Sequence, residues 1–196
     1  MPQPSSTRQE PHPRELRPVY LTGEHLYIRA LVLEDKQHAA AWFPSPFPIN
    51  ATRAEAFIKD VHKGEDPRTF HFVIARLEND EIVGGLKLWT TFRVGDIAFH
   101  MAPWLPDADE LRAEALGLAV RWLRDDYELM TIGVALPADA PLSLTAAEQA
   151  GMRQNVRLRE ALARPGGRVD ELWFQALNPR WIGQSADTEE AADAGA

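Results

Sequence analysis

The alternation of apolar and polar residues between 96 and 127 predicts a strand, a short loop and a long amphipathic helix. Ile97, Phe99 and Met101 alternate with other residues in the period of two that suits a strand with one buried face. Beyond the loop, apolar residues recur with the helical period of about 3.6 residues at Leu111, Ala115, Leu118, Ala119 and Trp122. A strand that leads into a helix in this way directs the free N–H groups of the first helical turn beyond the strand, where many folds bind an anion.

The remaining patterns predict a layered domain of strands and helices. Strands are expected at 25–31, 69–77, 81–91, 93–101, 129–136, 153–164 and 168–177. Helices are expected at 34–43, at 52–63 with a capping box formed by Thr52 and Glu55, and at 143–150 with Gly151 behind it. This order predicts an α/β (α+β) fold with a single mixed, mostly antiparallel sheet of about seven strands, flanked by helices on both faces.

The 196 residues fit one domain with an additional segment at each end. Residues 1–18 are rich in proline, serine and charged residues with little apolar surface to bury, so we expect a disordered arm. Residues 184–196 carry four acidic residues and no basic one, and we expect a disordered acidic tail. The folded domain is therefore predicted to span 19–183.

Charge and composition argue against several classes of function. The net charge of −8 argues against a surface for nucleic acid or anionic membranes, since both need clustered lysine and arginine. The chain has no cysteine, which excludes disulfides, thiolate metal ligands and a cysteine nucleophile. The six histidines are scattered without an i, i+4 pair, so no metal site is expected. No apolar run approaches the roughly 18 residues needed to span a bilayer, and we expect a cytoplasmic protein.

Five phrases of the sequence follow one another in a recognisable order. They are LTGEHLYIRALVLED at 21–35, FVIARLENDEIVGGLKL at 72–88, EALGLAVRWLRDDYEL at 114–129, EQAGM at 148–152 and the segment 167–181 with its closing tryptophan. Together they resemble the opening, the central hairpin, the third and fourth helices and the last strand of GNAT N-acetyltransferases. The closer likeness is to the RimJ/RimL-type branch of that superfamily.

This resemblance implies a GNAT-like fold and acetyl-CoA as the cofactor. It implies an acyltransferase that acts on a protein N-terminus or a small-molecule amine, in which the amine attacks the thioester directly. It is also compatible with a homodimer as the oligomeric state. The likeness extends from Leu21 to Trp181, which is most of the predicted domain.

The loop that binds the cofactor pyrophosphate in that family has a different composition here. The family signature Gln/Arg-x-x-Gly-x-Gly/Ala falls on Leu105, Ala108 and Glu110. Asp107, Asp109 and Glu110 can cap the first N–H groups of the helix themselves and would repel a phosphate. The asparagine that the family favours after its fifth strand corresponds to Ala140. The tyrosine that acts as the general acid in many members corresponds to Ala147. An alternative therefore stays open: a catalytically inactive GNAT-like domain that has lost CoA binding and acts as a binding or regulatory module.

The resemblance also implies site residues, each of which has a structural alternative. The candidates for catalysis are Asp96, His100 and Ser143. Asp96 could instead be a charge that faces solvent, and His100 a partly buried structural histidine. Ser143 could instead be the N-cap of a helix. The candidates for cofactor binding are Phe99, Met101, Ala108, Glu110, Leu111, Arg112 and Ser143. The candidates for substrate binding are Trp42, Phe47 and Trp89, of which the first two could equally pack the first helices together.

Overall fold

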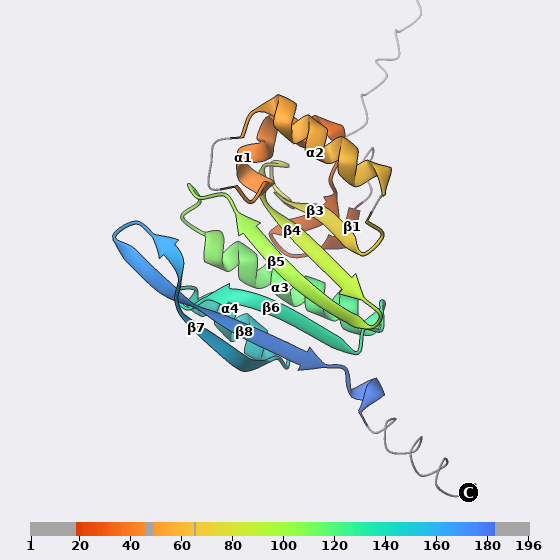
Figure 1. The fold of residues 1–196 in the computed structure, drawn as a ribbon, viewed down its shortest axis with the longest axis vertical. Coiled ribbons are helices and arrows are strands. Elements are labelled where there is room, and N and C mark those ends of the chain that lie inside the picture. The colour runs from red at the N-terminus through yellow and green to blue at the C-terminus, as the bar shows by residue number, and fades with distance from the viewer. Residues whose placement is uncertain (1–18, 46–48, 65, 183–196) are drawn as a thin grey trace, which may run out of the picture.

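Eight strands form one sheet in the order β1-β2-β3-β4-β5-β6-β8-β7 (Figure 1). The strands are β1 (Val19–Thr22), β2 (Leu26–Ala30), β3 (Thr69–Arg76), β4 (Ile82–Thr91), β5 (Val94–Met101), β6 (Thr131–Pro137), β7 (Arg153–Arg164) and β8 (Gly167–Leu177). The computed structural model describes residues 19–45, 49–64 and 66–182. The predicted arm (1–18), the predicted tail (184–196) and Phe47 lie outside these described residues.

Helices cover both faces of this sheet, as the sequence predicts. They are the 3-10 helix η2 (Leu33–His38), α1 (Ala39–Trp42), α2 (Ala51–Lys63), α3 (Ala108–Asp125), α4 (Pro141–Gln149) and the 3-10 turn η3 (Pro179–Trp181). On one face Trp42 and Ile58 pack with Val73 of the sheet. On the other face α3 and α4 pack on the larger cluster, and α3 lies behind β5 in Figure 1. Among the described residues no helix is long and apolar enough to cross a bilayer.

The sheet forks between β5 and β6, its one parallel pair in the described residues. Pairing begins at Val94 and Thr131 and ends at Ile97 and Val134, although β5 continues to Met101 and β6 to Pro137. The two strands therefore diverge toward the end at which α3 begins. Every other strand pair of the sheet is antiparallel.

Two predicted details of the first helices were wrong. The segment 34–43 is a 3-10 helix followed by one α-helical turn, not a single helix. The second helix begins at Ala51, because the side chain of Asn50 accepts a hydrogen bond of 2.8 Å from the Arg53 amide. The predicted capping box at Thr52 therefore lies inside the first turn. The sequence also missed β1, a short strand that pairs with β2 and, within the described residues, lies at the edge of the sheet.

A buried ion pair joins β2 to the first helices. The Arg29 guanidinium donates to both carboxylate oxygens of Asp35, at 2.8 and 2.7 Å, and both side chains are almost completely buried. The same carboxylate accepts from the Val32 amide, and the Trp42 indole donates to the Asp35 carbonyl at 2.8 Å. This pair therefore fixes the position of Trp42 against the sheet.

Candidate active site

The fork exposes backbone groups of β5 that a strand would otherwise pair. The Ala102 amide donates to the Val83 carbonyl of β4, so the peptide groups of alternate residues of β5 face β4. By this alternation the peptide groups of Phe99 and Met101 face β6, beyond the last rung at Ile97. They can therefore bond an extended polar chain inserted between the two strands.

The N-terminus of α3 faces this fork, and the acidic residues there are arranged differently from the prediction. N-cap Asp107 makes no side-chain cap hydrogen bond, so the expected capping of α3 by this carboxylate was wrong. Instead, Asp107 accepts two hydrogen bonds from Arg76 of β3, at 2.9 and 2.7 Å. Arg76 and Asp107 lie 31 residues apart in the sequence, and their ion pair balances the charge of one of the three acidic residues.

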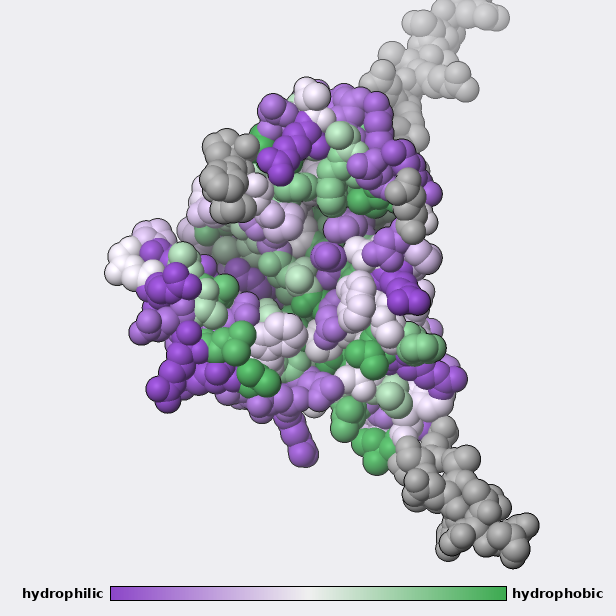
Figure 2. All heavy atoms as spheres, viewed as in Figure 1, coloured by the Kyte–Doolittle hydropathy of each residue, from purple (hydrophilic) through white to green (hydrophobic). Residues whose placement is uncertain are grey.

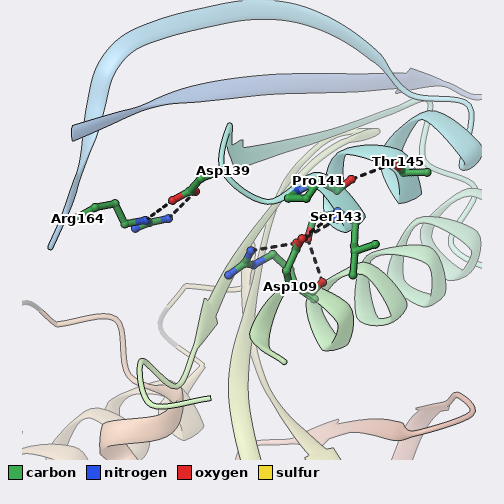
Figure 3. A network of polar contacts seen from close by, with 8 residues as sticks. Asp109, Asp139, Pro141, Ser143, Thr145 and Arg164 are labelled. Atoms are coloured by element: carbon green, nitrogen blue, oxygen red, sulfur yellow. Dashed lines mark hydrogen bonds and ion pairs between the residues drawn. The ribbon is translucent and has the colours of Figure 1, made fainter. Parts of the chain in front are cut away.

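Asp109 turns toward the other helix and caps α4 (Figure 3). Its carboxylate accepts hydrogen bonds from the Leu142 amide at 2.9 Å, the Ser143 amide at 3.1 Å and the Ser143 hydroxyl at 2.5 Å. Ser143 is completely buried, so this geometry gives its side chain a positioning role between the two helices. Its predicted roles in catalysis and in cofactor binding stay predictions.

We expect Asp109→Ala to lower the free energy of unfolding by about 1–2 kcal/mol, because α4 then loses its cap and the Ser143 hydroxyl its acceptor. Chemical denaturation followed by circular dichroism measures this change. Asp125→Ala, at the exposed end of α3, is the matched control and should change it by less than about 0.5 kcal/mol. Equal losses in the two variants would contradict the capping role.

Arg112 supplies positive charge on the fork side of α3. One of its nitrogens lies 3.7 Å from the Asp109 carboxylate, and the side chain is only 15% exposed. Burial lowers the pKa of Arg112, and the nearby Asp109 partly opposes this shift. Arg164 at the tip of the β7–β8 hairpin pairs with Asp139 at 2.9 Å (Figure 3). The predicted cofactor residue Arg112 is therefore placed where an anion could reach it.

The other predicted cofactor residues lie at the start of α3 with unequal exposure. Leu111 is buried in the core, Ala108 is half-buried, and Glu110 is exposed. Pro103 and Pro106 in the preceding loop have no N–H group, so fewer backbone donors are available than in a glycine-rich loop. Of the three acids, Glu110 is the one for which the described residues provide no ion-pair partner within 4.0 Å. Its charge therefore stays beside the helix N-terminus.

Asp96 lies one rung before the fork, on the face that carries α1. It is paired with Trp89 of β4 and Gly133 of β6. A Cβ atom at Gly133 would lie 2.2 Å from an oxygen of the Asp96 carboxylate, so the glycine leaves the space that this carboxylate occupies. Burial raises the pKa of Asp96. A half-buried carboxylate with a raised pKa, beside the gap between two strands, has the properties of a general base.

A cavity opens on the same face, beside α1 and α2, where Figure 2 shows the surface hollowed. Trp42, His71 and His100 line this cavity, whereas Trp89 lies outside it, exposed beside Asp96. Burial lowers the pKa of His100, opposed by a hydrogen bond to the Ala40 backbone and reinforced by the charge of Arg112. Burial and then the charge of Lys87 lower the pKa of His71.

The predicted site residues thus fall into two groups that the fold brings close together. Phe99, Met101, Ala108 and Arg112 border the fork from β5 and α3. His100 and Trp42 border the cavity on the α1 face, and Asp96 lies between the two groups on β5. The sequence reasoning missed Arg76, Gly133 and Lys87, because their importance depends on strands that are distant in the sequence.

Comparison with known proteins gives a family. No family model and no curated protein sequence matches the chain. A solved structure from Sphaerobacter thermophilus, provisionally assigned as an acetyltransferase, is 50% identical with a TM-score of 0.67, and the match covers 81% of this chain and 98% of that one. The chain therefore belongs to the same acetyltransferase family as that protein, and its fold is the GNAT fold.

Two more distant structures share the fold. Mycobacterium smegmatis RimJ in complex with CoA-disulfide is 17% identical, with a TM-score of 0.59 and coverage of 90% of this chain and 93% of that one. The spermidine/spermine N-acetyltransferase SpeG from Vibrio cholerae is 18% identical, with a TM-score of 0.59 and coverage of 82% and 97%. At these identities the likeness establishes the fold alone.

Proposed function

We propose that the chain is an acetyl-CoA-dependent N-acetyltransferase that acts on a primary amine, either a small molecule or a protein N-terminus of the kind the RimJ/RimL-type branch modifies. The observation that carries this proposal is the fork between β5 and β6, where Phe99 and Met101 direct unpaired peptide groups into the gap. Arg112 and the uncapped amides of α3 lie at the same end of that gap. The acetyltransferase that is 50% identical and the CoA-bound RimJ structure that shares the fold support it.

In this proposal each part of the site has one task. Acetyl-CoA supplies an acetyl group activated as a thioester. The backbone of Phe99 and Met101 binds its extended arm, and Arg112 with the first amides of α3 binds its phosphates. Asp96 accepts a proton from the ammonium group of the acceptor, whose nitrogen then bonds to the acetyl carbon as the C–S bond breaks and the CoA thiolate leaves. The nitrogen releases its second proton to solvent as the amide forms.

No tyrosine is available at the position of the family's general acid. That position is Ala147, which is completely buried in the core of the α3 face. We therefore propose that the departing thiolate takes its proton from solvent rather than from a side chain of α4. His100 borders the cavity, and its lowered pKa suits a neutral imidazole that orients the acceptor amine.

A second candidate function is a binding module that has lost CoA. The observation that favours it is Glu110, an exposed carboxylate in the first turn of α3, in a loop without glycine. Two like charges about 4 Å apart repel by about 1 kcal/mol in water and by more when partly desolvated. The repulsion of one carboxylate weakens phosphate binding but is small compared with the total for a micromolar ligand, which is about 8 kcal/mol.

We expect calorimetric titration to give micromolar binding of acetyl-CoA, and Glu110→Gln to tighten it by about fivefold because one like charge is removed. Glu148→Gln, an equal change of charge at the other end of α4, is the control and should leave the affinity unchanged. If neither the wild type nor Glu110→Gln gives heat at millimolar acetyl-CoA, the proposed acetyltransferase function is wrong and the second candidate, a binding module that has lost CoA, is favoured.

A further inference from the structure

The cavity on the α1 face is lined by aromatic and imidazole rings. Trp42 and Phe57 come from the helices, and His71 and His100 come from β3 and β5, whereas the rings of Phe72 and Phe99 lie on the α3 face of the sheet. Phe57 packs edge-on against His71 at 5.0 Å and tilted against Trp42 at 5.9 Å, which connects the wall formed by the helices with the floor formed by the sheet. Such a lining favours binding of a ligand with an apolar group and binds a flexible polar chain only weakly.

The titratable side chains that line this cavity are either positively charged or neutral. Lys87 is its one lining lysine, and no aspartate or glutamate lines it in the described part of the chain. His71 and His100 have lowered pKa values, so both imidazoles are neutral near pH 7. The carboxylate of Asp66 lies near enough to be influenced by Lys87, but it accepts bonds from the Thr69 hydroxyl and the Arg68 amide.

Register places one cation and one anion on the same open face. Lys87 of β4 is paired with Ala98 of β5, and the next rung pairs Trp89 with Asp96. The ammonium of Lys87 has no carboxylate within 4.0 Å among the described residues, and Asp96 has no ion pair there either. A ligand that brought an ammonium group to Asp96 and an anionic group to Lys87 would satisfy both.

We propose that the acceptor is a zwitterionic amine with an apolar body, such as an amino acid with an aromatic side chain. Its side chain enters the aromatic cavity, its carboxylate pairs with Lys87, and its amine faces Asp96 beside the fork. A polyamine fits poorly, because its additional ammonium groups would meet Lys87 and find no carboxylate in the cavity. This inference rests on the proposed acetyltransferase function and narrows its substrate.

The test compares three probes in a thiol-release assay with acetyl-CoA: L-phenylalanine, L-phenylalaninamide, which lacks the carboxylate, and spermidine. We expect kcat/KM for phenylalanine to exceed that for the amide by about tenfold and that for spermidine by more, mainly through KM. Lys87→Met should remove the preference for phenylalanine over the amide. Lys59→Met, on the exposed surface of α2, is the matched control and should preserve it.

Calorimetry with acetyl-CoA alone separates the two ways of failing. If acetyl-CoA binds but spermidine is the preferred acceptor, or Lys87→Met leaves the preference unchanged, the inferred substrate class is wrong and the proposed function stands. The same conclusion follows if acetyl-CoA binds and none of the three probes is acetylated. If acetyl-CoA does not bind, the proposed function fails and this inference fails with it. A retained preference in Lys59→Met together with a lost one in Lys87→Met supports the proposal.

Discussion

Replacing Asp96 with asparagine is expected to lower kcat about 100-fold while leaving the affinity for acetyl-CoA unchanged. The asparagine keeps the shape that fits beside Gly133, but it cannot accept a proton from the acceptor ammonium. Steady-state kinetics with a primary amine, together with calorimetry for acetyl-CoA, measure the two quantities separately. Asp60→Asn, an exposed carboxylate of α2, is the control and should retain full activity.

The same variant should gain stability at neutral pH. Burial raises the pKa of Asp96 in the folded state above its unfolded value. A group of this kind stabilises the fold fully below its unfolded pKa, and this contribution is lost as the pH rises through the folded pKa. At neutral pH the ionised Asp96 is therefore a cost that asparagine removes, so Asp96→Asn should unfold at a higher temperature. An unchanged kcat in this variant would contradict the assignment of Asp96 as the general base.

Breaking the buried ion pair between Arg29 and Asp35 should destabilise the fold strongly. Arg29→Met removes the guanidinium that balances the charge of the buried Asp35 carboxylate, and we expect a loss of about 3–5 kcal/mol in the free energy of unfolding. Urea denaturation measures this loss. Lys63→Met, which removes the exposed Lys63–Asp60 pair of α2, should cost less than about 1 kcal/mol.

A double variant tests whether the loss comes from the buried charge of Asp35 that Arg29 balances. Arg29→Met combined with Asp35→Leu removes both charges and should be more stable than Arg29→Met alone. Because the Asp35 carbonyl also accepts the Trp42 indole, both variants should raise KM for the acceptor more than they lower kcat. A cost below 1 kcal/mol for Arg29→Met would show that this pair does not hold the first helices on the sheet.

The hydrophobic pattern predicted most of the sheet because β2 to β6 and β8 contain buried apolar residues, whereas β7 is mostly exposed. It failed at β1, whose four residues are mostly exposed and pair with one neighbour. It also placed the buried face of α3 slightly wrong, since Leu116, Val120 and Leu123 are buried whereas Leu118 and Trp122 lie at the margin. In α2 both Asn50 and Thr52 can cap a helix, and the choice depends on where the preceding turn ends.

The site was less predictable because it depends on contacts between distant segments. The sequence indicates three acids at the start of α3, but it cannot indicate that Asp107 turns to Arg76 or that Asp109 caps a helix 34 residues later. The space for Asp96 depends on the parallel register that places it beside Gly133. Resemblance to a family could locate the strand and the helix, but not these side-chain orientations.

The most direct test of the account is amide hydrogen exchange of the protein with and without CoA. If CoA occupies the fork, the amides of Phe99 and Met101 and those of the first turn of α3 should exchange more slowly when it is bound. The amides of the β7 edge, such as Arg159, should be unaffected and serve as the internal reference. Unchanged exchange at Phe99 and Met101 under saturating CoA would contradict the claim that the gap between β5 and β6 is the cofactor site.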